Sequence, residues 1–190
     1  MLAAAKQVFL ERGFEGATLD EVIARAGGSR ATLYAQFGDK EGLFAAIIEE
    51  LCAEILAGLP SAGAEDAPEA VLCALGQAYM KTLMAPANLA LYRMVIGESA
   101  RFPKLGARVY ASGPLAAAQR LAAYLKGEIA RGRLILDDAD LAARHFLEMV
   151  KGDLHTRALF GIGRRAGAAE IDACVRAAAR TFCDGAKCGR

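Results

Sequence analysis

The first 50 residues divide into short helical segments separated by glycines, and this spacing constrains the fold more than any other feature. Leu2, Ala5, Val8 and Phe9 recur at helical intervals, and Gly13 follows them as a stop signal. Two more short segments with helical spacing follow before residue 38. We therefore expect this part of the chain to form a group of short helices.

A capping pattern marks where the second segment begins. Thr18 and Glu21 stand three positions apart, so the Thr18 hydroxyl is placed to accept from the Glu21 amide while the Glu21 carboxylate returns to the Thr18 N–H. This pattern predicts a helix over 19–26 that Gly27-Gly28 ends, and Ser29 is predicted to cap the next helix. Two short helices joined by a glycine-containing turn form a helix-turn-helix, whose second helix enters a DNA major groove.

The remainder of the 190-residue chain carries helical signals and little β-branched alternation. Alanine, the strongest helix former, supplies much of the 55% hydrophobic content. We predict an all-α protein with a helix-turn-helix domain at 1–48 and a helical domain at 49–190. The small and helix-breaking residues of Gly58–Ala64 are the one plausible linker. Helices are expected after Asp39 and at 68–84, 88–99, 102–112, 115–131, 141–160 and 170–184.

Two acidic positions are expected to cap later helices. Asp66 precedes Pro68, a residue that suits the first turn of a helix, and Asp138 or Asp140 precedes the long segment that begins at Leu141.

The distribution of charge does not mark a basic DNA-binding domain. The whole chain has a formal net charge of +1, but residues 1–50 hold 5 Lys or Arg against 8 Asp or Glu, a net charge of −3. DNA binding must therefore rest on the local placement of positive side chains. The acidic first 50 residues also keep open a helical interaction module that does not bind DNA. Salt-sensitive duplex binding distinguishes the two alternatives.

Several other classes of protein are not indicated. The 5 cysteines form no Cys-x-x-Cys pair, which predicts reduced thiols in the cytoplasm and no metal or cofactor. His145 and Glu148 lie one turn apart, but two ligands are too few for a metal site. The longest apolar stretch, 71–92, is interrupted by polar residues and a proline, so no membrane helix is expected. No nucleophile and base stand together, so we do not predict an enzyme.

Residues 5–44 resemble the TetR family of transcription regulators. The phrase IARAGGSRATLYAQFGDKEGLF at residues 23–44 is far more specific than a generic helix-turn-helix. The remainder of the chain fits the family only in layout, as a helical ligand-binding and dimerising domain. The matching positions are Ala5, Phe9, Gly13, Thr18, Ile23, Ala24, Ala26-Gly27, Ser29, Thr32-Leu33-Tyr34, Phe37, Lys40-Glu41 and Leu43.

The resemblance implies which residues contact DNA. Those in the first turn of the recognition helix meet base edges, and Arg30, the only long basic side chain there, suits the O6 and N7 atoms of guanine. The hydroxyl groups and the amine nearby suit contacts with phosphate. Two alternatives stay open: that Thr18 and Ser29 serve only as helix caps, and that Arg30 is an ordinary solvent-exposed charge. The predicted DNA-binding residues are Thr18, Ser29, Arg30, Ala31, Thr32, Tyr34 and Lys40.

The sequence departs from the family pattern at two places. Gly28 stands where relatives usually have an apolar residue, commonly Val, so one core contact of the turn is expected to be missing. Relatives also carry a basic stretch ahead of the first helix, whereas this sequence begins at Met1 inside that helix.

Two long segments near the C-terminus carry apolar stripes at three- and four-residue spacing. They suit either the core of one chain or, as the resemblance implies, a four-helix interface between two chains. The predicted interface residues are Phe146, Met149, Gly152, Ile171, Cys174, Val175, Ala178 and Phe182.

Aromatic and apolar residues of the C-terminal part also suit a cavity for a small, mostly apolar effector, although most of them equally suit an ordinary core. The predicted effector-binding residues are Tyr79, Tyr92, Arg93, Val95, Ile96, Phe102, Tyr110 and Tyr124. Together these observations predict a cytoplasmic repressor that binds a palindromic double-stranded operator as a homodimer and is released by the effector.

Overall fold

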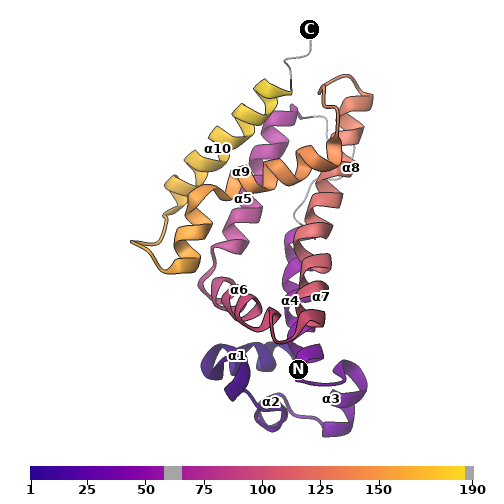
Figure 1. Cartoon of the computed structure of the whole chain (residues 1–190), viewed down its shortest axis with the longest axis vertical. Helices are drawn as coiled ribbons and strands as arrows, with labels where there is room; N and C mark the ends of the chain where they lie inside the picture. Colours follow the sequence, from indigo (N-terminus) through magenta and orange to yellow (C-terminus); the bar gives the residue numbers. More distant parts are fainter. Residues whose placement is uncertain (58–65, 187–190) are drawn as a thin grey trace. The chain divides into compact units, whose positions relative to one another are not determined.

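The computed structural model describes residues 1–57 and 66–186, so the predicted linker Gly58–Ala64 and Cys188 lie outside the described residues. Within them there is no strand, which confirms the all-α prediction. Figure 1 labels the helices, which are α1 (Leu2–Gly16), α2 (Leu19–Ala26), α3 (Arg30–Phe37), α4 (Lys40–Ala57), α5 (Pro68–Leu83), α6 (Pro86–Ser99), α7 (Pro103–Tyr110), the π-helical turn η1 (Ala111–Leu115), α8 (Ala116–Ala130), α9 (Ala139–Phe160) and α10 (Ala168–Gly185).

These helices form two compact units. The first consists of Met1–Glu54 and Pro86–Pro114, and the second of Ile55–Ala85 and Leu115–Arg190. The first unit therefore includes α6 and α7 besides the predicted helix-turn-helix, because α6 packs against α1 and α7 packs against α6. The boundary at residue 48 stays a prediction about which part of the chain carries which function.

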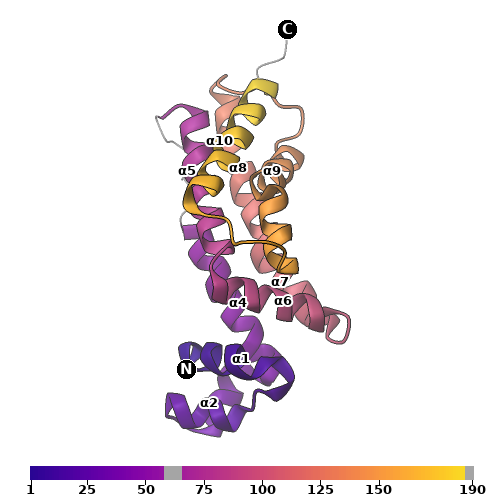
Figure 2. The same ribbon diagram turned by 90° about the vertical axis from the view of Figure 1, so that its left-hand side faces the viewer.

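An aromatic cluster forms the centre of the first unit. The Phe44 ring of α4 packs edge-on against Phe9 and Phe14 of α1, with ring centroids 4.9 and 5.3 Å apart. Phe102 lies against Phe14 at 5.5 Å. Such ring pairs stabilise beyond the apolar area they bury. They hold α1 and α4 together, and Figure 2 shows α2 lying beside α1.

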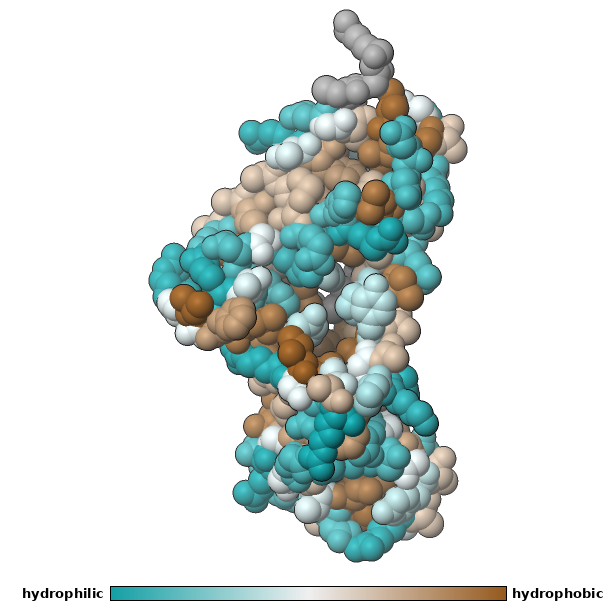
Figure 3. Space-filling model, in the orientation of Figure 1, coloured by the Kyte–Doolittle hydropathy of each residue, from teal (hydrophilic) through white to brown (hydrophobic). Residues whose placement is uncertain are grey.

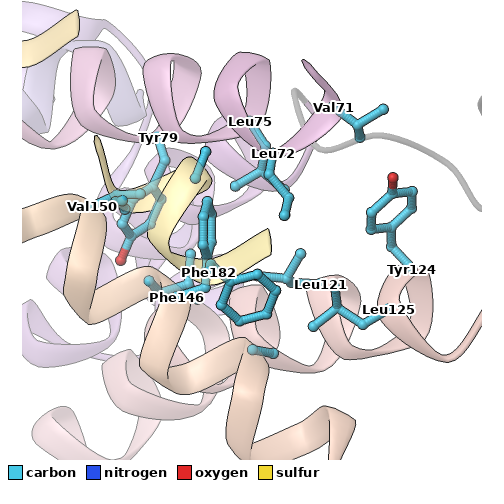
Figure 4. Close-up of a cluster of buried hydrophobic side chains, with 14 of the residues drawn as sticks. Val71, Leu72, Leu75, Tyr79, Leu121, Tyr124, Leu125, Phe146, Val150 and Phe182 are labelled. Carbon is cyan, nitrogen blue, oxygen red and sulfur yellow. The ribbon is translucent and has the colours of Figure 1, made fainter. Parts of the chain in front are cut away.

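The second unit is a helical bundle in which α5 packs against α10 and α9, and α8 packs against α9. Figure 4 shows side chains from these helices directed into one interior, among them Leu75 of α5, Leu121 of α8 and Phe146 of α9. The Phe146 and Phe182 rings meet edge-on at 5.3 Å. None of the described helices is long and apolar enough to cross a membrane.

The helix starts of the second unit agree with the sequence at one cap and differ at another. Of the two predicted caps Asp138 and Asp140, Asp138 caps α9 by accepting from the amides of Asp140 and Leu141, both at 2.9 Å, so the helix begins at Ala139 and not at Leu141. These bonds, chiefly that from Leu141, lower the pKa of Asp138. The cap predicted at Asp66 is wrong, because α5 begins after Ala67 with no side-chain cap.

Between the helices predicted at 102–112 and 115–131 the structure has no break but the π-helical turn η1, which contains Pro114. A proline lacks the N–H that an α-helix needs at an interior position, and the wider turn accommodates that loss.

Gly76 lets α5 approach its neighbours closely, and this generates a stability prediction. A Cβ added there lies 2.7 Å from Val175 Cγ1 and 3.2 Å from Val150 Cγ1. Because β-branched side chains are stiff, Gly76→Ala is expected to lower the free energy of unfolding by about 1–3 kcal/mol despite the better helix propensity of alanine.

Gly127→Ala on α8 is the matched control, because its nearest neighbour is Arg131 Nη1 at 3.9 Å. This change is expected to stabilise the chain by up to about 1 kcal/mol. Urea unfolding followed by circular dichroism measures both variants, and an equal gain for both contradicts the packing argument.

Candidate nucleic-acid interface

Side-chain hydroxyls begin the two helices of the predicted helix-turn-helix. Thr18 Oγ1 accepts from the Glu21 amide at 3.2 Å and Ser29 Oγ accepts from the Thr32 amide at 3.1 Å, so both predicted caps are confirmed. The returning half of the capping box is wrong. Glu21 Oε1 instead pairs with Arg12 and Arg25, because two guanidinium groups are a stronger partner than one amide.

The turn between α2 and α3 depends on two successive glycines. Gly27 has a φ of 71° and Gly28 a φ of 105°, a conformation that residues with a Cβ rarely adopt. A Cβ at Gly28 meets only Met1 Cε, at 3.6 Å. The apolar contact that relatives make at this position is therefore missing here, as predicted. The glycine in its place allows the backbone to adopt the positive φ.

Helix α3 packs on the first unit through the fully buried Leu33 and the half-buried Phe37, and its other residues are exposed. Leu33 is its buried residue, with no exposed surface, and Tyr34 is 52% exposed. The structure exposes six of the predicted DNA-binding residues and leaves Lys40 partly buried. The exposed ones are Thr18, Ser29, Arg30, Ala31, Thr32 and Tyr34. A helix attached on one side and exposed on the other is the geometry that entry into a major groove requires.

Arg30 forms an ion pair with a residue of α2 in the free chain. Its Nη2 lies 2.6 Å from Oδ2 of Asp20, and both side chains are largely exposed. Leu19 and Tyr34 complete a small concave site of about 230 Å³ around this pair. The sequence analysis missed this partner, because Asp20 and Arg30 are ten residues apart and only the crossing of α2 over α3 brings them together.

Lys40 also has intramolecular partners that the sequence did not reveal. Its Nζ lies 3.2 Å from the Glu15 carbonyl oxygen and 3.4 Å from that of Ala17. It also lies 4.9 Å from the centroid of the Phe14 ring. Lys40 therefore satisfies carbonyls at the end of α1, where the helix dipole attracts a cation.

Most of the negative charge of α1 and α2 is neutralised by ion pairs. Arg25 binds Glu11 at 2.6 Å and Glu21 at 2.7 Å, and Arg12 adds a contact to Glu21 at 3.3 Å. Arg25 donates hydrogen bonds to both carboxylates, which lowers the pKa of Glu11 and raises the pKa of Arg25. The carboxylates of residues 1–50 that form no ion pair among the described residues, such as Glu50, therefore lie outside α1 and α2.

The predicted interface residues lie mostly inside the second unit. Phe146, Val175, Ala178 and Phe182 are buried in its core, and Met149, Ile171 and Cys174 pack against that core. Gly152 is exposed and has a φ of 49°, which kinks α9, and a Cβ there lies 3.2 Å from Cys174 Sγ. The stripe noticed in the sequence is thus the side of α9 and α10 that faces the chain's own interior.

The predicted effector-binding residues are divided between the two units. Tyr79 and Tyr124 are buried in the second unit, and burial raises the pKa of Tyr124 to about 12. In the first unit, Val95 is buried in the core, and the rest range from half-buried to exposed; they are Tyr92, Arg93, Ile96, Phe102 and Tyr110. In the part of the chain that the structure describes, no group of three His, Cys, Asp or Glu residues is placed to hold a metal ion.

An exposed recognition helix with capped ends and a glycine turn defines a helix-turn-helix DNA-binding protein, and comparison with known families agrees. Residues 1–47 match the family model of bacterial regulatory proteins of the tetR family. Residues 70–185, more than half of the chain, match the C-terminal domain of AefR-like transcriptional repressors. The chain belongs to the TetR family of transcriptional regulators.

Solved structures share the fold along nearly the whole chain. A TetR-family regulator from Mesorhizobium loti has a TM-score of 0.87 and 26% identity, with 97% of this chain and 93% of that chain covered. The flavonoid-responsive regulator FrrA has a TM-score of 0.80 and 34% identity over the same shares of the two chains.

Curated relatives match over shorter stretches of the chain. The transcriptional repressor BepR of Brucella suis is 48% identical over 48 residues, and the transcriptional activator FasR of Mycolicibacterium smegmatis is 36% identical over 62 residues. These matches cover 25% and 33% of this chain, and 23% and 28% of the relatives. The chain thus spans about a quarter of the length of the curated relatives it matches.

The ion pair between Glu11 and Arg25 predicts a specific loss of stability in acid. The pKa of Glu11 lies below its ordinary value of 4.5 in the folded chain. Its contribution is therefore fully present above pH 4.5 and is lost as the pH falls through the lowered pKa. Wild type is expected to melt at a higher temperature than Glu11→Gln at pH 7, and this difference is expected to shrink below pH 4.5.

Thermal unfolding at a series of pH values measures the difference. Glu50→Gln is the control, because Glu50 is exposed and forms no ion pair among the described residues. A gap between wild type and Glu11→Gln that stays constant down to pH 3 rules out the linkage.

Proposed function

We propose that this chain is a ligand-responsive transcriptional repressor that binds a palindromic operator as a homodimer and is released by a small, mostly apolar effector. The observation that carries the proposal is the exposure of Ser29, Arg30, Ala31, Thr32 and Tyr34 at the start of a helix whose Leu33 is buried in the first unit. Repression is favoured because the C-terminal family model describes transcriptional repressors and BepR is a repressor.

Arg30 is the residue expected to recognise a base. It stands in the first turn of α3, and its side chain is 68% exposed, so the guanidinium can reach the O6 and N7 atoms of guanine. Thr18, Ser29, Thr32 and Tyr34 place hydroxyls around it that suit phosphate or base edges.

Dimerisation is proposed through the outer side of α9 and α10. Ala173 and Ala177 lie one turn apart on α10 and are exposed, and Gly152 is exposed on α9. In Figure 3 a pale-brown, weakly hydrophobic surface covers the upper left, where Figure 1 places α10. Small exposed residues allow two helix pairs to approach closely, as in a four-helix bundle.

The effector is proposed to bind in the helical domain predicted at residues 49–190. FrrA, which is 34% identical along nearly the whole chain, is described as flavonoid-responsive, and this supports a small aromatic or otherwise apolar molecule. The Tyr124 hydroxyl is buried without a hydrogen-bond partner among the described residues, which suits a polar group on such a ligand. Release requires the effector to bind the DNA-incompetent arrangement more tightly, and operator DNA must then weaken effector binding by the same factor.

The DNA-binding proposal predicts different effects for two cationic residues. Arg30→Ala is expected to weaken binding to an operator selected from random duplexes by about 1–3 kcal/mol and to relax the preference at one symmetric pair of positions. Lys40→Ala is expected to weaken binding to all sequences alike and to lower the salt dependence by about one phosphate contact.

Fluorescence anisotropy with single-base operator variants at two salt concentrations measures both effects. The melting temperature of Lys40→Ala is measured beside its affinity, because Lys40 also binds carbonyls at the end of α1. An unchanged base preference in Arg30→Ala would remove Arg30 from the recognition surface. A wild-type chain without sequence preference contradicts the proposed function itself.

The dimer proposal predicts that Ala177→Glu separates the two chains, because an unpaired carboxylate is costly in a packed interface. Operator affinity is expected to fall with it, since two half-sites then no longer bind together. Ala123→Glu on α8 is the control, as Ala123 is also exposed. Ala178 is unsuitable because it is 5% exposed within its own unit. Sedimentation velocity that finds wild type monomeric, or Ala177→Glu still dimeric, contradicts this interface.

A further inference from the structure

The pairing of Asp20 with Arg30 has a role that the capping and packing of the two helices do not explain. Asp20 lies in the first turn of α2 and Arg30 in the first turn of α3, with 2.6 Å between Oδ2 and Nη2. Both side chains are more than half exposed, so the pair lies on the surface that carries the recognition residues. An exposed ion pair adds little to stability, and its position suggests another use.

We propose that Asp20 is a specificity-determining positioning residue, which holds Arg30 for a base edge and opposes its capture by the DNA backbone. The inference rests on the proposed function, because it concerns how the same surface distinguishes one duplex sequence from another.

The chemistry of the guanidinium permits this arrangement. Arginine has five N–H donors in a planar fork, and Asp20 accepts from Nη2. Donors that remain can bind the O6 and N7 atoms of guanine while the carboxylate stays bound. The ion pair also restricts the side chain, so less rotational freedom is lost when Arg30 meets a base.

A phosphate meets a different situation at the same place. The phosphate competes with Asp20 for the guanidinium. It also brings a second negative charge close to the Asp20 carboxylate, and the two negative charges repel each other. Guanine presents neutral acceptors and avoids that repulsion. Every duplex carries phosphates, whereas a correctly placed guanine occurs only in the operator, so Asp20 lowers binding to unrelated DNA more than binding to the operator.

The wall of the concave site around the pair strengthens the argument. Leu19 and Tyr34 flank Asp20 and Arg30 in the site of about 230 Å³. Leu19 adds an apolar side chain to the lining of this site and no further charge. Asp20 is therefore the anionic member of this site, and a change of Asp20 to a neutral residue leaves Arg30 without its carboxylate partner there.

The test compares wild type, Asp20→Asn, Arg30→Ala and the double variant. The probes are a duplex selected by the wild-type chain from a random-sequence library and an unrelated duplex of equal length. Asp20→Asn is expected to bind the unrelated duplex about two- to fivefold more tightly. Its salt dependence there is expected to steepen by about 0.9, the value of one added phosphate contact. The selected duplex is expected to gain less, so the ratio of the two affinities falls.

The double variant shows whether Asp20 acts through Arg30. In the Arg30→Ala background, Asp20→Asn is expected to leave the affinity ratio unchanged. Glu41→Gln removes one negative charge elsewhere in the first unit and is expected to shift both duplexes equally. An unchanged ratio in Asp20→Asn, or an equal fall without Arg30, overturns the inference and leaves the proposed function standing. A wild-type chain that selects no duplex overturns both.

Discussion

The contact of Phe44 with Phe9 and Phe14 is the interaction on which the DNA-binding surface depends. It joins α1 to α4 through rings that have almost no exposed surface. Helix α2 packs on α1, and α3 packs on α2, so the position of α3 is set by a chain of contacts that starts at these rings. Since α3 itself buries only Leu33 fully, its orientation comes from its neighbours and its cap more than from its own packing.

Four cationic side chains of the helix-turn-helix already have intramolecular partners in the free chain. Arg12 and Arg25 are bound to carboxylates of α1 and α2, Arg30 is bound to Asp20, and Lys40 is bound to carbonyls at the end of α1. These cations already have polar partners in the free chain, so the net free energy of any DNA contact is only the gain beyond those partners. A helix-turn-helix can therefore carry a net charge of −3 over its first 50 residues while every carboxylate of α1 and α2 is bound to an arginine.

Local signals were predictable and side-chain partners were not. The caps at Thr18 and Ser29 followed from short-range chemistry, and the structure has both. For the helix after residue 137 the sequence left Asp138 and Asp140 open, and the structure uses Asp138. The cap at Asp66 failed because the same residue type also serves in ordinary turns. The stripe on α9 and α10 was visible in the sequence, but periodicity alone does not tell which surface it faces, and the structure turns most of it inward.

By itself the sequence determined the helical class, the helix-turn-helix and the exposed residues of its recognition helix, because helix periods, caps and glycine turns act over a few neighbouring positions. The tertiary structure alone decided that α6 and α7 join the first unit, that Lys40 closes the end of α1 and that Asp20 binds Arg30. These contacts join residues far apart in the chain. They exist only after the helices cross, and no local pattern encodes the angle at which they do so.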